Sequence, residues 1–261
     1  MHIKILWRLL ILSWVSVGVQ GQEVTLYGDD DYRPYSYVEN GVQKGIYSDI
    51  LREIDHELPS YQLVLKALPW KRGLRMLKRG DIAFLYPPYK RPKERAYMNY
   101  SRPILHEVLS LFCRKDTLLT SASIFPDDFK GLSVGKSLGF SIGDKVHEAG
   151  GLGLISLTSA KGAMTNLQKL LHKELHCYVN DRLSILYELE SLQKQGLYDG
   201  ESIIETVTLS SEYGHIGITK KVAGFPYIKG FIEQLDLAIE RLEKKGEIKK
   251  IVERYMKDVH R

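Results

Sequence analysis

Patterns typical of β-strands and α-helices alternate along almost the whole chain, and this alternation restricts the fold more than any other feature of the sequence. Apolar or alternating runs mark expected strands at 23–28, 61–68, 81–86, 131–135, 154–157, 176–181 and 215–220. Amphipathic stretches mark helices at about 48–58, 71–79, 142–148, 160–172 and 182–192, and a final pair split near Gly246. The alternation predicts an α/β fold with mainly parallel sheets flanked by helices.

One extended run interrupts this order. ILHEVLSLFCRKD, residues 104–116, is longer than an ordinary strand, and a second alternating set begins after it at GLSVG, residues 131–135. A strand of this length can carry the chain from one lobe into another. GLSVG also matches G-x-S-x-G, but Ser133 lies inside the expected strand and no helix follows directly, so the motif does not favour a hydrolase.

The first 22 residues, MHIKILWRLLILSWVSVGVQGQ, begin with Lys4 and Arg8, continue as an apolar run to Val19 and end in small residues. This order is typical of a secretory signal peptide, and we expect residues 1–21 to be removed. The alternative is a membrane anchor, but the apolar run is shorter than the roughly 20 residues that span a bilayer. No cysteine lies near the cleavage site. We therefore expect a soluble periplasmic protein that is not a lipoprotein.

Charge and cysteine content exclude several classes of function. The chain has 37 basic and 32 acidic residues, and the leader holds two of the former and none of the latter, which leaves 35 against 32. Without a long Lys/Arg tract, nucleic acid is not an expected partner. We expect no cofactor and no metal, since HKELH at 172–176 lacks a third ligand. Cys113 and Cys177 lie in apolar runs, and either a disulfide or two buried thiols fits them.

Several local patterns occur in an order that resembles one family. These patterns are Asp29, Tyr32 and Pro34 in GDDDYRPYSY; Gly45 and Asp49 in GIYSDI; Trp70 before a helix and GDIAF; Arg95 in YPPYKRPKERAYMNYSRP; and Asp181 in HCYVND. Together they resemble the bacterial extracellular solute-binding proteins of family 3, the type II periplasmic binding proteins. The likeness covers nearly the whole mature chain, and its strength lies in the ordered set.

The resemblance implies two lobes joined by two crossing strands. Lobe 1 would comprise residues 22–109 and 211–261, and lobe 2 residues 110–210. A ligand would bind between them and stabilise a closed form for a transporter or sensor to recognise.

The resemblance also implies a set of ligand-binding side chains. In Arg95, a planar guanidinium is suited to an α-carboxylate, and Ser141 offers donors from the other lobe. Asp29 and Asp181 are candidates for an ammonium group, while Tyr32, Trp70 and Tyr86 would wall the site. Alternative interpretations stay open: Asp181 as a helix N-cap, Arg95 as a surface residue, and Tyr32 and Trp70 as core packing.

The chain departs from amino-acid binders where small hydroxyl residues usually follow the strand, because Leu85, Tyr86, Pro87 and Pro88 stand there. We expect a monomeric, non-enzymatic protein that binds a small polar molecule, an amino acid or a related carboxylate or amine, for an inner-membrane ABC transporter or a sensor. Two alternatives remain. One is a dehydratase-type enzyme on the same scaffold, which needs a general acid in the cleft. The other is a sensory or accessory protein without a ligand.

Overall fold

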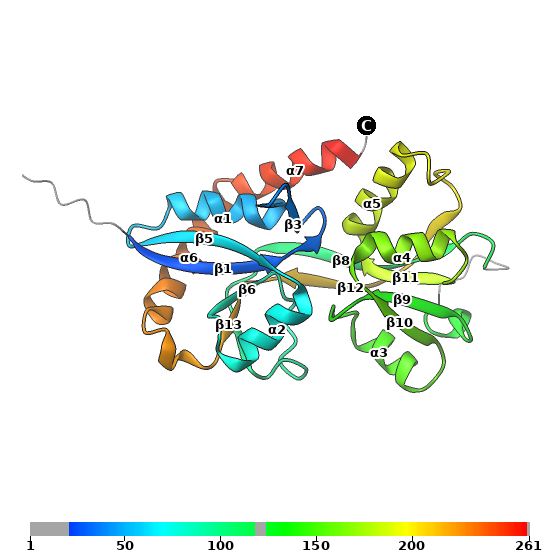
Figure 1. Ribbon diagram of the computed structural model, residues 1–261, viewed down its shortest axis with the longest axis horizontal. Helices are drawn as coiled ribbons and strands as arrows, with labels where there is room; N and C mark the ends of the chain where they lie inside the picture. Colours follow the sequence, from blue (N-terminus) through cyan, green and yellow to red (C-terminus); the bar gives the residue numbers. More distant parts are fainter. Residues whose placement is uncertain (1–20, 118–123, 260–261) are drawn as a thin grey trace, which may run out of the picture.

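The computed structural model describes residues 21–117 and 124–259, which fold into the two lobes seen side by side in Figure 1. The predicted signal peptide lies outside the described residues except for Gly21. No helix in the described ranges is long and apolar enough to cross a membrane.

The first lobe is built on a five-stranded sheet with strand order β5-β1-β6-β13-β7. Its strands are β1 (Gln22–Asp29), β5 (Tyr61–Leu68), β6 (Phe84–Tyr86), β7 (Met98–Tyr100) and β13 (Gly217–Thr219). Three helices pack on it: α1 (Ile46–His56), α2 (Trp70–Arg79) and α6 (Ile228–Lys244). A fourth helix, α7 (Glu247–Val259), packs against α1 and α6. Its buried core includes Phe84 and Phe231, whose ring centroids are 4.8 Å apart.

The second lobe has a five-stranded sheet of order β10-β9-β11-β8-β12. Its strands are β8 (Leu105–Arg114), β9 (Ser133–Ser137), β10 (Ser156–Ala160), β11 (Cys177–Asp181) and β12 (Ile203–Gly214). Its helices are α3 (Asp144–Gly151), α4 (Gly162–Leu171) and α5 (Arg182–Lys194), with short 3-10 turns at Asp127–Phe129 here and Val222–Gly224 in the first lobe. The strand expected at 131–135 runs over Ser133–Ser137, so Ser133 stands at its start rather than in its middle, and the next helix begins only at Asp144.

Both large sheets are mixed. In each, three neighbouring strands are parallel and two further pairings are antiparallel. The parallel part follows from the strand–helix alternation. The antiparallel part arises where the chain crosses between lobes or returns: β8 and β12 pair antiparallel from Leu105↔Gly214 to Arg114↔Ile203. The predicted lobe boundaries, at 109/110 and 210/211, fall within these two strands and stay a prediction.

A small third sheet lies where the lobes face each other. It consists of β2 (Asp31–Tyr32), β3 (Ser36–Glu39) and β4 (Val42–Lys44). The turn between β3 and β4 is Asn40-Gly41, and both residues have positive φ, 51° and 76°. Asn-Gly is favoured at such two-residue hairpin turns because both residues tolerate this backbone conformation.

A disulfide joins the second lobe's inner strands. Cys113 of β8 and Cys177 of β11 are directly opposite in the antiparallel pairing, and their sulfurs are bonded. The question left open by the sequence is therefore answered in favour of the bridge, which closes a loop with a sequence separation of 64.

Candidate functional site

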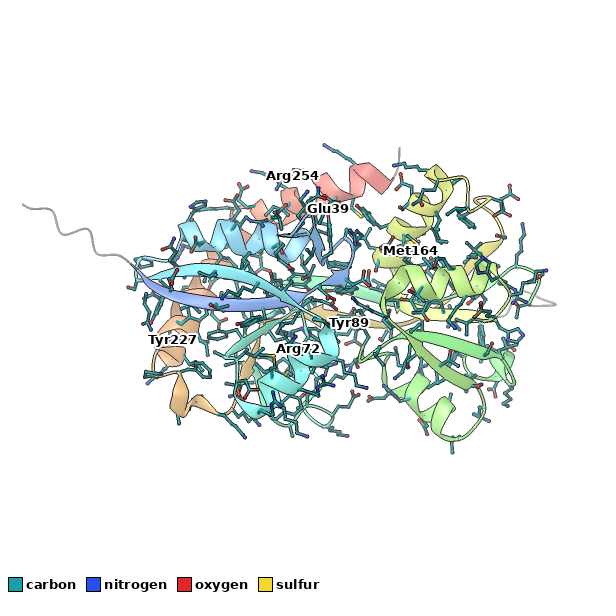
Figure 2. All side chains as sticks on the ribbon, in the orientation of Figure 1. Glu39, Arg72, Tyr89, Met164, Tyr227 and Arg254 are labelled. Atoms are coloured by element: carbon teal, nitrogen blue, oxygen red, sulfur yellow. A yellow bond between two sulfur atoms is a disulfide. The ribbon has the colours of Figure 1, made fainter. Side chains whose placement is uncertain are left out.

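A small pocket lies at the contact between the lobes, near Tyr89 in the centre of Figure 2. Six of its lining residues come from the first lobe and two from the second: Asp29, Tyr32, Trp70, Pro87, Tyr89 and Arg95, with Phe140 and Ser141. Several follow the carboxyl ends of parallel strands, which meet at one edge of a sheet and form the usual binding crevice of α/β folds. The pocket has a volume of about 20 Å³, room for about one water molecule.

Five of the seven predicted site residues line this pocket, and Tyr86 and Asp181 do not. Tyr86 is fully buried inside the first lobe, with its hydroxyl 3.3 Å from Ser48 Oγ. Asp181 caps α5: its carboxylate accepts hydrogen bonds from the backbone N–H of Ser184 at 2.9 Å and of Val108 at 3.0 Å. Both carboxylate oxygens thus have backbone donors: the bond from Ser184 is the N-cap contact, and that from Val108 ties the carboxylate to β8.

Arg95 brings a buried positive charge to the pocket. Arg95 is only 6% exposed. It donates a long hydrogen bond of 3.4 Å to Gly139 O, and its Cζ lies 5.7 Å from the centroid of the Trp70 ring. Burial lowers the pKa of Arg95. Among the described residues, no carboxylate lies within ion-pair distance of it. A guanidinium has five N–H donors, so most of its hydrogen-bonding capacity is unused here.

Asp29 brings an unpartnered acid to the same pocket. It is 3% exposed, and Oδ1 accepts a hydrogen bond from Asp31 N at 3.0 Å. Its other oxygen, Oδ2, is buried without a hydrogen-bond partner. Burial raises the pKa of Asp29 well above its usual range. An unpartnered buried oxygen is costly, so this atom is suited to a ligand group that donates a hydrogen bond.

Phe140 from the second lobe occupies the aromatic slot of the first. Its ring packs edge-on against Tyr32, with centroids 5.0 Å apart, and lies 6.1 Å from Trp70. Trp70 Nε1 donates a hydrogen bond to Gly139 O at 3.2 Å, which holds the same loop. Tyr32 and Trp70 thus both line the pocket, and the side chain of Phe140 from the opposite lobe packs against both of them. The sequence analysis does not single out Phe140.

A buried glutamate lies directly behind the pocket. Glu107 of β8 accepts hydrogen bonds from Tyr32 at 2.5 Å, Tyr47 at 2.5 Å and Tyr89 at 2.7 Å. Burial raises the pKa of Glu107 to about 8, and the charge of Asp181 adds to this effect. Because Tyr32 and Tyr89 also line the pocket, the glutamate fixes two of its walls.

Arg91 connects the crossing strands to the second lobe. Its Nε donates to Ser141 Oγ at 3.0 Å, and its guanidinium forms an ion pair with Glu212 of β12. Tyr86 and Arg95 are the predicted site residues of the loop at 86–95, and Arg91 is not among them. In the structure the Arg91 side chain is only 18% exposed, so a second residue of this loop takes part in the contact between lobes.

The geometry defines a two-lobed binding architecture with a cleft that offers a cation, an unpartnered acid and aromatic walls. The described ranges contain no group of three His, Cys, Asp or Glu residues placed to hold a metal ion. The sequence matches the family of bacterial extracellular solute-binding proteins, family 3, over residues 24–258. The chain therefore belongs to this family, as its ordered motifs predict.

Solved structures give the same fold. An ancestral arginine-binding protein bound to arginine has a TM-score of 0.74 and 17% identity, covering 91% of this chain and 99% of that one. A histidine kinase sensor domain similar to periplasmic binding proteins has a TM-score of 0.74 and 16% identity, covering 90% and 96%. An ancestral amino-acid-binding protein, a precursor of cyclohexadienyl dehydratase, has a TM-score of 0.68 and 16% identity, covering 89% and 94%. No curated protein matches the chain.

Proposed function

We propose that this protein captures a small polar molecule carrying a carboxylate, an amino acid or a related compound, in the cleft between its lobes. The observation that carries the proposal is the pairing of Arg95 with Asp29 in one pocket. Arg95 supplies a buried guanidinium without a carboxylate partner, and Asp29 supplies a buried oxygen without a donor. A ligand carboxylate would satisfy the first through two parallel hydrogen bonds, and a ligand ammonium or hydroxyl the second.

The small volume of the pocket implies that the ligand enters while the lobes are apart. Phe140 must then leave the slot beside Tyr32 for any ligand larger than a few atoms. Closure around the ligand would bury it between Arg95 and Ser141, and differential affinity for the closed form would drive the change. We propose that the chain is exported by its leader, residues 1–21, and acts in the periplasm, where an inner-membrane ABC transporter or a sensor recognises the closed form.

Ligand titration by calorimetry tests this proposal. The mature chain is screened by thermal shift against amino acids, polyamines, small carboxylates and aromatic metabolites, and each hit is then titrated. Arg95→Ala should weaken binding by roughly 10- to 100-fold, the value of a charge-assisted bidentate contact. Arg72→Ala is the matched control, because Arg72 is an exposed arginine on α2 (Figure 2). Equal affinity in the Arg95 variant and the wild type would contradict the proposal.

A dehydratase-type enzyme is the second candidate, and Asp29 is the observation that favours it. Burial raises the pKa of Asp29 and so favours its protonated form in the cleft, the form that a general acid needs. Chromatography of the ligand after prolonged incubation separates the two functions. Recovery of the ligand unchanged supports binding alone, whereas product formed by the wild type and lost in Asp29→Asn supports the enzyme.

A further inference from the structure

A second groove lies between the lobes and shares no lining residue with the pocket. Its volume is about 670 Å³. One side is formed by the first lobe's β2–β3 hairpin and the other by α4 and α5 of the second lobe. Figure 2 labels one residue on each side, Glu39 and Met164, across the upper part of the contact between lobes.

This groove is acidic. Four carboxylates line it, those of Asp31, Glu39, Glu188 and Glu190. Two of the four have partners of their own: Glu39 pairs with Lys44 at 2.5 Å, and Glu190 pairs with Lys194 at 2.6 Å.

Two further cations act on the remaining two acids. The charge of Lys161 acts on Asp31, and that of Arg33 acts on both Asp31 and Glu188. The Arg33 guanidinium lies over the Tyr37 ring, 4.3 Å from the centroid, and is 3.9 Å from Asp31. Among the residues that line the groove, four acids stand against two cations, Arg33 and Lys194, so its lining carries an excess of negative charge.

Glu188 is the least compensated of the four. It is 4% exposed, it lines the groove, and it forms neither a hydrogen bond nor an ion pair with any described residue. Burial raises the pKa of Glu188 to about 7; the charge of Arg33 opposes this effect and that of Asp31 adds to it. A buried carboxylate without a partner is unfavourable, and it becomes favourable when a cation is brought to it.

Asp31 approaches Glu188 from the other lobe. The side chain of Asp31 lies so close to the start of α4 that a methyl group added at Gly162 would overlap its Oδ2. Burial raises the pKa of Asp31; the charges of Lys161 and Arg33 oppose this effect, and that of Asp30 adds to it. Two carboxylates on opposite lobes therefore face one groove, and the one on the second lobe, Glu188, has no ion-pair or hydrogen-bond partner among the described residues.

We propose that this groove is a second binding site, for a small organic cation whose ammonium or guanidinium group lies between Asp31 and Glu188. Met164 and Tyr187 supply apolar and aromatic surface for a short aliphatic chain. The described residues hold no cluster suited to a metal ion, which makes an organic cation the better fit. Because its two carboxylates belong to different lobes, the bound cation favours the closed form and so raises the affinity of the cleft for its own ligand. The site itself does not depend on the proposed function of the cleft.

Calorimetric titration of the full mature chain with spermidine, and separately with agmatine, tests the proposal. Saturable binding is expected in the wild type, with at least a tenfold loss in Glu188→Gln and in Asp31→Asn. Glu53→Gln is the control, because Glu53 is an exposed acid on α1 that does not line the groove. Glu188→Gln removes a buried charge, so this variant should fold at least as stably as the wild type.

Three outcomes would overturn the second site. Equal affinity in wild type and Glu188→Gln would show that the acid does not bind the cation. Equal competition by magnesium and by sodium chloride at matched ionic strength would show diffuse charge screening. Binding lost in Arg95→Ala but kept in Glu188→Gln would place the cation in the cleft. Binding kept in Arg95→Ala and lost in Glu188→Gln supports the groove.

Discussion

Replacement of Glu107 by glutamine should change how the stability of the protein depends on pH. In the folded protein Glu107 is 1% exposed and its pKa is raised to about 8, from an ordinary value of 4.5. At neutral pH the folded protein therefore holds a proton that the unfolded chain has released. The contribution of Glu107 to the free energy of unfolding is then largest at low pH, and it falls as the pH rises from about 4.5 towards 8.

The size of the effect follows from proton linkage. One extra proton in the folded state costs about 1.4 kcal/mol of stability per pH unit, or about 2.7 kcal/mol between pH 5.5 and 7.5. Glutamine cannot ionise, but its amide resembles the protonated carboxyl in shape and can still meet the hydroxyls of Tyr32, Tyr47 and Tyr89. The variant should lose about 1 kcal/mol or less at low pH and gain relative to the wild type as the pH rises.

Urea unfolding at several pH values between 5.5 and 8.5 measures this difference. Burial also raises the pKa of Asp181 to about 6 and that of Glu188 to about 7, but both residues are present in wild type and variant. Subtracting one curve from the other removes their contribution, apart from the coupling of Asp181 to Glu107. A difference in unfolding free energy that stays constant with pH would refute the assignment of a protonated Glu107.

Three further changes have defined outcomes. Phe140→Ala should empty the slot beside Tyr32 and improve the binding of ligands with aromatic side chains at least tenfold, measured by calorimetry against a small aliphatic ligand. Asp181→Ala should lower the melting temperature by removing the acceptor of two backbone N–H groups, a loss of about 2 kcal/mol, while ligand affinity changes little. Replacing Cys113 and Cys177 together by serine should cost about 4 kcal/mol, as expected for a loop with a sequence separation of 64, and urea unfolding would show it.

Elements defined by local patterns were predictable from the sequence. The helix at 71–79 ends at Gly80, which has a φ of 82° and caps α2 as a glycine does after a helix. The split near Gly246 separates α6 from α7, and the Asn-Gly turn joins β3 to β4. Each of these turns and helix ends depends on residues within a few positions of one another, so each can be predicted from the sequence.

The contacts within the site were harder to predict, because most of them join distant parts of the chain. Asp29, Tyr32, Trp70, Arg95 and Ser141 follow strand ends or helix starts, and such positions gather at the cleft of an α/β fold. Most partners of Phe140, Arg91 and Glu107 are 50 or more residues away, such as Ser141 for Arg91 and Tyr32 for Glu107. No local spacing reveals those partners.

The two misplaced residues have a different cause. Tyr86 is the last residue of β6, and its ring packs against Gly28 of the neighbouring strand, so the next residue, Pro87, lines the pocket in its place. The carboxylate of Asp181 has two possible uses, and a sequence cannot decide between them. The backbone donors of Ser184 and Val108 do so in the structure.

The crossing strands connect the proton on Glu107 to the cleft. Glu107 and Glu212 stand directly opposite each other in β8 and β12, and two ionised carboxylates in that position would repel. The two carboxyl groups have different surroundings: Glu107 lies among three tyrosine hydroxyls, whereas Glu212 forms an ion pair with Arg91. Arg91 also donates a hydrogen bond to Ser141 Oγ, and Ser141 lines the pocket from the second lobe. The Arg91 side chain therefore connects the charge of Glu212 to the pocket. Ionisation of Glu107 would place a second negative charge beside this network, so the pH at which Glu107 titrates should also be a pH at which the closed form weakens.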